Sequence, residues 1–134
     1  MENNYIDKLA WVELKDRKVL ETCSRGKNIW YIPGGKREKG EDDKSALTRE
    51  IKEELQVDLM SDTFKLFGVF EAQAHGKPEG TMVRMTCYTA QYKGELEPAA
   101  EVEKMDWFDY SKRNMVSPVD QLIFDDLKNK NLID

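Results

Sequence analysis

The chain has 134 residues, a length that suits one domain with a hydrophobic core and is short for two. Apolar residues make up 40% of the chain and charged residues 35%, a composition that excludes a disordered protein. The net charge of −5 argues against long nucleic acid as a partner, since that affinity comes from Lys and Arg side chains that neutralise many phosphates. We therefore expect residues 1–134 to form a single domain.

The cysteines and the apolar stretches indicate the compartment. Cys23 and Cys87 lie far apart in the sequence, without a CxxC pair or nearby histidines, which argues against a disulfide framework and against a zinc site. No apolar stretch reaches the length of a secretory signal or of a membrane span. We expect a cytoplasmic protein that has no membrane partner.

Alternating apolar residues predict the strands. Residues 5–14 place Ala10 and Val12 on one side of an extended chain and Leu9 and Trp11 on the other. Segments rich in β-branched and aromatic residues predict further strands at 19–24, 29–32, 64–74, 81–94 and 102–110. The Pro-Gly-Gly at 33–35 is expected to break the ladder after the third strand, because proline has no N–H to donate.

Two amphipathic helices are predicted. The first runs from about residue 43 to residue 55, where an apolar stripe recurs every four residues at Leu47, Ile51 and Leu55. The second follows Ser117-Pro118, an N-cap with proline at the first helical position. Its buried face is predicted to comprise Val119, Leu122, Ile123 and Leu127. Strands before, between and after two helices predict an α/β fold with a mixed β-sheet and a helix on each face.

Three glutamates crowd one edge of the first helix. Glu50, Glu53 and Glu54 fall within an arc of roughly 100° that borders the apolar stripe. Like charges at these spacings cost a few tenths of a kcal/mol per pair, so something must offset the repulsion. A hard divalent cation such as Mg²⁺ would do so, because it takes oxygen ligands and shares them with phosphates. Gly35 could bring its backbone carbonyl to the same cation, since it has no Cβ.

The spacing of residues 35–57 resembles the signature of the Nudix hydrolases. The matching positions are Gly35, Glu41, Arg49, Glu50, Ile51, Glu53, Glu54 and Val57. Only Gln56 departs, standing where the family has the glycine that ends the helix, and a left-handed Gln56 would cost roughly 1 to 2 kcal/mol. The resemblance implies an α/β/α sandwich that hydrolyses a nucleoside diphosphate linked to another group and requires Mg²⁺ or Mn²⁺.

The resemblance also implies roles for these residues. Glu50, Glu53 and Glu54, with Gly35, would hold the metal, and Glu50 and Glu53 would be catalytic. Arg49 would order the motif through a salt bridge to a glutamate, for which Glu41 is placed near the helix start.

A fourth acid often precedes a tryptophan-containing strand in this family. Glu101 and Glu103 both precede Trp107, and Glu101 is the better candidate for a base or an extra metal ligand. The alternative is that both are solvated loop charges.

Basic residues outside the motif are candidate substrate contacts. Arg25 and Lys36 flank the loop that should border the substrate, where a positive rim attracts polyphosphate, although a solubilising surface is the simpler alternative for each. Arg84 lies among apolar residues of a predicted strand, so it binds either a phosphate or an acid across the sheet.

The expected substrate is a small nucleotide, foremost a nucleoside di- or triphosphate. The alternatives are a nucleotide-sugar or dinucleoside polyphosphate pyrophosphatase, and a non-catalytic domain that senses a nucleotide. A homodimer is also an open alternative, because related enzymes are often dimers.

Overall fold

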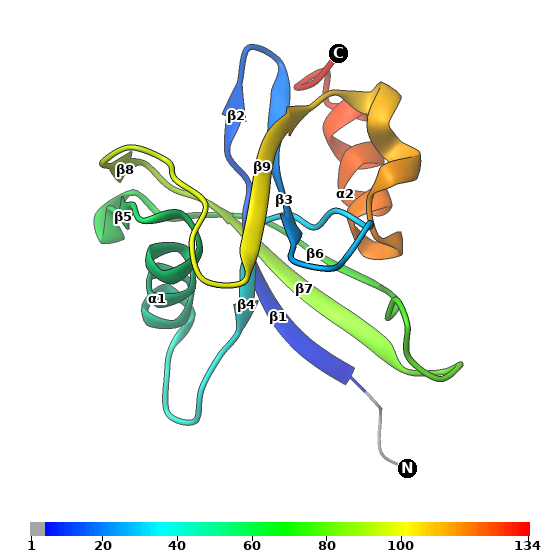
Figure 1. Cartoon of the computed structure of the whole chain (residues 1–134), viewed down its shortest axis with the longest axis horizontal. Coiled ribbons are helices and arrows are strands. Elements are labelled where there is room, and N and C mark those ends of the chain that lie inside the picture. The colour runs from blue at the N-terminus through cyan, green and yellow to red at the C-terminus, as the bar shows by residue number, and fades with distance from the viewer. Residues whose placement is uncertain (1–4) are drawn as a thin grey trace.

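The two larger β-sheets lie between two α-helices in this computed structural model, which describes residues 5–134 (Figure 1). The helices are α1 (Asp43–Leu55) and α2 (Pro118–Asn129), and 3₁₀ turns occur at Ser61–Thr63 and Tyr110–Met115. The strands are β1 (Tyr5–Trp11), β2 (Leu14–Lys15), β3 (Lys18–Ser24), β4 (Gly34–Lys36), β5 (Asp58–Leu59), β6 (Lys65–Gln73), β7 (Met82–Thr89), β8 (Tyr92–Lys93) and β9 (Val102–Phe108).

The larger sheet is mixed. It has the strand order β4-β1-β7-β6, in which β1 is parallel to β7 while β4 and β6 are antiparallel to their neighbours. The second sheet has the order β2-β3-β9 and is antiparallel, and β5 pairs with β8. These pairings confirm the predicted α/β class with a mixed sheet.

The alternation along β1 separates two hydrophobic cores. Leu9 and Trp11 belong to the cluster under α1, whereas Ala10 and Val12 belong to the cluster under α2. The two helices accordingly lie on opposite sides of the sheets in Figure 1. The sandwich predicted from the sequence is confirmed.

Local sequence signals place α1 where it was predicted. The Asp42 side chain accepts a hydrogen bond from the Ser45 N–H (2.8 Å) and caps the helix. The buried face comprises Ala46, Leu47, Ile51 and Leu55. Gln56 ends the helix in the left-handed conformation, with φ 63°, and its N–H donates to the carbonyl of Lys52 (3.1 Å). The helix therefore ends as it would at glycine, although glutamine is strained there.

The predicted strand at 29–32 is wrong. This segment makes only isolated bridges, from Tyr31 to Thr22 and from Trp30 to Val116. The ladder instead includes the Pro-Gly-Gly turn: the carbonyl of Pro33 accepts from the Trp11 N–H (2.9 Å), and β4 follows at once. Proline is tolerated here because it contributes only an acceptor.

Other element boundaries also differ from the prediction. The strand predicted at 5–14 ends at Trp11 and resumes as β2, which forms a hairpin with β3, and the strand predicted at 81–94 divides into β7 and β8. Leu122, predicted to be buried, is 40% exposed, and Asp120 takes a place on the buried face of α2. Neither α-helix of residues 5–134 is long and apolar enough to cross a membrane.

Candidate active site

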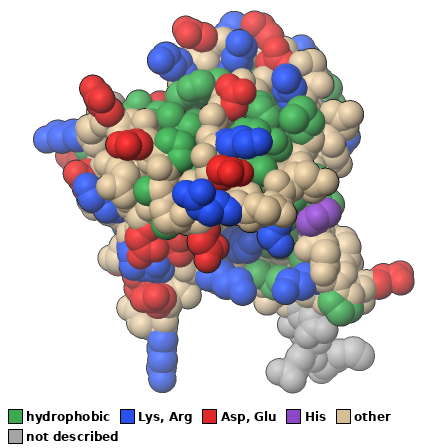
Figure 2. Space-filling model, viewed as in Figure 1, with side chains coloured by type: hydrophobic (Ala, Val, Ile, Leu, Met, Phe, Trp, Pro, Cys, Tyr) green, Lys and Arg blue, Asp and Glu red, His purple; other side chains and the backbone are tan. Residues whose placement is uncertain are grey.

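Four glutamates line one pocket beside α1. Glu50, Glu53 and Glu54 reach it from the helix, and Glu101 reaches it from the loop that precedes β9. The pocket has a volume of about 350 Å³, and its remaining lining residues are Ser24, Ala100 and Val102. In Figure 2, acidic and basic side chains gather around a hollow below the centre of this face. The structure thus brings the three predicted helix acids together with Glu101.

Strand β4 passes directly against the acidic edge of α1. The Gly34 N–H donates to Oε1 of Glu54 (3.3 Å). A Cβ added to Gly35 would lie 2.5 Å from Cδ of Glu50 and 2.7 Å from each of its carboxylate oxygens. Only glycine leaves room for this approach, so the carboxylate of Glu50 lies against the backbone of β4.

The surroundings of Glu54 disfavour its charged form. Burial raises the pKa of Glu54 to about 8, and the neighbouring charges of Glu50 and Glu53 contribute in the same direction. The nearby cation Arg49 pairs with Glu50 and Glu53 but not with Glu54. Glu54 is therefore a half-buried carboxyl that a cation in the pocket would stabilise in its ionised form.

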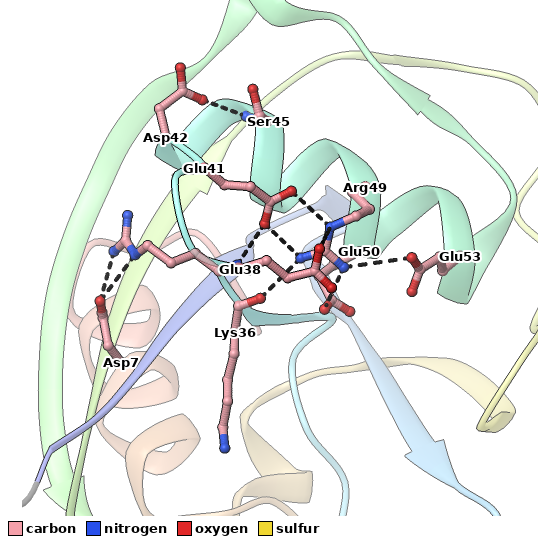
Figure 3. A network of polar contacts seen from close by, with 10 residues as sticks. Asp7, Lys36, Glu38, Glu41, Asp42, Ser45, Arg49, Glu50 and Glu53 are labelled. Atoms are coloured by element: carbon pink, nitrogen blue, oxygen red, sulfur yellow. Dashed lines mark hydrogen bonds and ion pairs between the residues drawn. The ribbon is translucent and has the colours of Figure 1, made fainter.

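Arg49 connects the acids into one network (Figure 3). Its guanidinium donates two hydrogen bonds to Glu41, from Nε (2.9 Å) and from Nη2 (2.8 Å). It also pairs with Glu50 (3.2 Å) and Glu53 (3.6 Å), and it donates to the carbonyl of Lys36 (3.2 Å). The bond from Arg49 lowers the pKa of Glu41 to about 2. A bidentate pair of this kind holds both side chains in one geometry.

The donor set fits a hard divalent cation. Carboxylate and carbonyl oxygens are the ligands that Mg²⁺ and Mn²⁺ prefer, and Gly35 leaves its backbone open on the side of Glu50. Within residues 5–134, no three acidic, histidine or cysteine side chains already stand in metal-ligand geometry. Small movements of the helix glutamates would be needed, which agrees with the mutual repulsion of uncompensated carboxylates.

Comparison with known proteins identifies the family. The sequence matches the NUDIX domain over residues 6–125. The chain belongs to the Nudix family. It is therefore a Nudix hydrolase, of an enzyme class that cleaves the pyrophosphate bond of nucleotide derivatives and generally needs a divalent metal ion. No curated protein matches the sequence at a significant level.

Solved structures share this Nudix fold. The E. coli ORF135 protein aligns with a TM-score of 0.73 at 20% identity, covering 94% of this chain and 92% of that one. A MutT protein from Methanosarcina mazei aligns with a TM-score of 0.74 at 16% identity, covering 98% of both chains. A NUDIX hydrolase from Nitrosomonas europaea aligns with a TM-score of 0.72 at 22% identity, covering 96% of this chain and 91% of that one. At these identities the likeness shows the fold alone.

Two of the predicted substrate contacts lie near the Nudix acids. Arg25 is exposed after β3, and its backbone N–H donates to the carbonyl of Glu101 (2.9 Å), which places it beside the acid pocket. Lys36 ends β4 and is exposed, and its side chain points away from the Arg49 network in Figure 3.

Arg84 has a different environment. Its Nε donates to Oε2 of Glu71 on the neighbouring strand (2.7 Å), and its guanidinium lies 4.2 Å from the ring centroid of Tyr5. It lines neither the acid pocket nor the two adjoining pockets of the described residues. The sequence left two alternatives open for Arg84, a phosphate or an acid across the sheet, and Glu71 is such an acid.

The sequence analysis missed the continuation of the cleft. A second pocket of about 270 Å³ shares Ser24, Glu54 and Val102 with the acid pocket, and Lys8 and Tyr31 line it. The sequence did contain a signal that Lys8 faces inward. Lys8 and Ala10 are two residues apart in β1 and so lie on the same face of the strand, the face that packs toward α2.

A pair of buried acids was also missed. Glu21 on β3 and Asp120 on α2 are both 0% exposed, and Oδ2 of Asp120 accepts from the Ile32 N–H (2.6 Å). Asp120 fixes the segment that leads to β4 by holding this amide. The spacing of Asp120 from Ile123 and Leu127 was the available signal, since it repeats the period of the buried face.

Proposed function

We propose that this Nudix hydrolase cleaves the pyrophosphate bond of a nucleoside di- or triphosphate with the help of Mg²⁺ or Mn²⁺. Glu50, Glu53, Glu54 and the backbone carbonyl of Gly35 would hold the ion. The observation that carries the proposal is the approach of Gly35 to the Glu50 carboxylate at the edge of a pocket that Glu53, Glu54 and Glu101 line. When bound, the ion supplies positive charge to the pyrophosphate oxygens and acidifies water.

The reaction requires a water molecule and a proton acceptor. The water oxygen forms a bond to one phosphorus, the bridging P–O bond on the far side breaks, and each product keeps a phosphoryl group. The water must also lose a proton. Glu101 is our candidate base, because it lines the same pocket as the helix glutamates and comes from a different element, the loop before β9.

The remaining polar residues position these groups. Arg49 holds Glu50 and Glu53 through ion pairs of 3.2 and 3.6 Å, while its bidentate bond to Glu41 anchors the guanidinium. Arg25 is our basic candidate for a phosphate contact, because its backbone N–H is hydrogen bonded to the carbonyl of Glu101. A positive side chain at this rim favours the approach of a polyphosphate.

A neutral isostere of one helix acid tests the proposal. We expect Glu53→Gln to lower kcat by about 100-fold or more, with an unchanged unfolding midpoint, because the amide keeps the shape of a partly exposed side chain (55%) and removes its charge. The matched control is Glu95→Gln, an exposed acid outside the pocket, which should keep full activity. A folded Glu53→Gln enzyme with ordinary metal-dependent turnover would refute the assignment.

A substrate panel separates the alternatives. The wild-type protein with Mg²⁺ or Mn²⁺ would be offered nucleoside di- and triphosphates, nucleotide sugars and dinucleoside polyphosphates, and released phosphate and pyrophosphate would be measured. Preference for nucleoside di- or triphosphates supports the proposal. Preference for nucleotide sugars or for dinucleoside polyphosphates would show that the proposed substrate class is wrong and that the corresponding alternative is right. Tight nucleotide binding without turnover of any compound would favour the sensing alternative.

A further inference from the structure

A lysine side chain lies inside the cleft that leads away from the acids. Lys8 lines the second pocket together with Glu54, and it also lines a third, small pocket of about 60 Å³. These two pockets share Lys8, Tyr31 and Met85. Lys8 therefore lies where the second pocket adjoins the third. The second pocket in turn adjoins the pocket of the acids proposed to bind the metal.

Lys8 makes no direct ion pair within the described residues, although the charges of Asp120 and Glu54 act on it from farther away. None of the ion pairs of residues 5–134 involves it. Its contact is with the face of Tyr31, whose ring centroid lies 5.6 Å from Nζ. A half-buried ammonium group has lost part of its hydration, and a cation in that state is stabilised when an anion reaches it.

The charges around Lys8 reinforce this need. Lys36 stands opposite Lys8 in the pairing of β1 with β4, and Lys77 lines the third pocket. Burial lowers the pKa of Lys8, both lysines act in the same direction, and Asp120 and Glu54 oppose them. Lys36 and Lys77 thus add positive charge at this end of the cleft.

The cleft geometry indicates which anion would arrive. The pocket of the acids and the pocket of Lys8 are continuous, because they share Ser24, Glu54 and Val102. An extended ligand whose pyrophosphate lies at the acids, and which continues into the second pocket, would place its next group beside Lys8. If the β- and γ-phosphoryl groups of a nucleoside triphosphate lie at the acids, that next group is the α-phosphoryl group, which joins the nucleoside.

We propose that Lys8 binds the third phosphoryl group of the substrate and makes the enzyme prefer nucleoside triphosphates over diphosphates. The proposal rests on the proposed function for the position of the pyrophosphate. The ammonium group of Lys8 lies 5.6 Å from the ring centroid of Tyr31, and a diphosphate would leave it without an anion.

Kinetics with paired substrates test the preference. Lys8→Met keeps most of the aliphatic length and removes the charge, so the fold should persist. We expect kcat/KM for a nucleoside triphosphate to fall about tenfold or more, as for the loss of one charge-assisted hydrogen bond, and kcat/KM for the diphosphate of the same base to change less than about twofold. Lys8→Arg should restore much of the preference, and Lys65→Gln, on the exposed strand β6, should leave both values unchanged.

A metal-free measurement keeps this proposal separate from the proposed function. Inorganic tripolyphosphate would be titrated into chelator-treated protein while NMR follows the Lys8 side chain, with Lys8→Met as the comparison for affinity. Shifts of Lys8 and weaker binding by the variant support the anion site even if no substrate is hydrolysed. Equal losses for tri- and diphosphate, or an unchanged preference in Lys8→Met, would overturn the proposal while leaving the hydrolase assignment to the Glu53→Gln test.

Discussion

The buried pair Glu21 and Asp120 should make folding stability fall as pH rises. Neither carboxylate oxygen of Glu21 has a hydrogen-bond donor among residues 5–134, and Asp120 lies beside it. Burial raises the pKa of Asp120 to about 7, and burial together with the charge of Asp120 holds the pKa of Glu21 well above its usual value. A proton on either carboxyl would supply the missing donor.

The sign and size of the effect follow from proton linkage. The unfolded chain ionises both groups near pH 4, whereas the folded chain still binds their protons above that pH. Each such group therefore removes about 1.4 kcal/mol of stability for every pH unit between its unfolded and folded pKa. For Asp120, whose pKa rises from 3.8 to about 7, the loss between pH 4 and pH 7 is about 3 kcal/mol, and it reaches about 4 kcal/mol above pH 7.

Glu21→Gln isolates one of the two groups. Glutamine does not titrate, has nearly the same volume and can donate its amide N–H to Asp120. We expect the free energy of unfolding of the variant, measured by urea denaturation without metal, to fall less steeply with rising pH than that of the wild type between pH 5 and pH 7. The difference in slope is about 1.4 kcal/mol per pH unit wherever folded wild-type Glu21 keeps its proton.

The control is Glu103→Gln, a neutral substitution at an exposed position of β9. Its stability curve should run parallel to that of the wild type over the same pH range. If the Glu21→Gln curve also ran parallel, the two buried carboxyls would not hold protons in the folded state, and the reasoning would be refuted.

Two further substitutions test the geometry at the ends of the Nudix motif. Gly35→Ala should leave the fold intact but displace the carboxylate of Glu50, which an added Cβ would meet at 2.5 Å, so Mn²⁺ affinity by calorimetry should fall about tenfold or more. Unchanged Mn²⁺ affinity would contradict the proposal that Gly35 and Glu50 together bind the metal. Gln56→Gly should raise the unfolding free energy by about 0.5 to 1 kcal/mol, because glycine adopts φ 63° without strain, although the bond from Nε2 of Gln56 to the Lys52 carbonyl is lost. Lower stability of this variant would show that the glutamine is not strained.

The helix and its acids could be predicted because their signals are local. The cap at Asp42 and the stripe at Leu47, Ile51 and Leu55 lie within one short window, and the structure confirms them. The rotation per residue of an α-helix is constant, so the spacing of the glutamates already placed them along one edge.

Strand boundaries and face assignments were less predictable. Residues 29–32 are apolar and aromatic, yet they form only isolated β-bridges. The hydrogen bonds from the Trp11 N–H to the Pro33 carbonyl and from the Ile32 N–H to Asp120 hold the end of this segment in place. Leu122 is apolar, as a buried residue would be, but its side chain is exposed because it lies beside the buried face of α2. In both cases the partner across the fold decided the outcome.

The sequence by itself determined the acidic helix edge and the Nudix family, since these depend on residue types at short, constant spacings. Only the tertiary structure decided that β4 brings Gly35 against Glu50, that the loop before β9 adds Glu101, and that β1 turns Lys8 into the same cleft. Those contacts join residues far apart in the chain. They depend on strand order and register, which are set by how the whole chain buries its apolar surface and not by any local pattern.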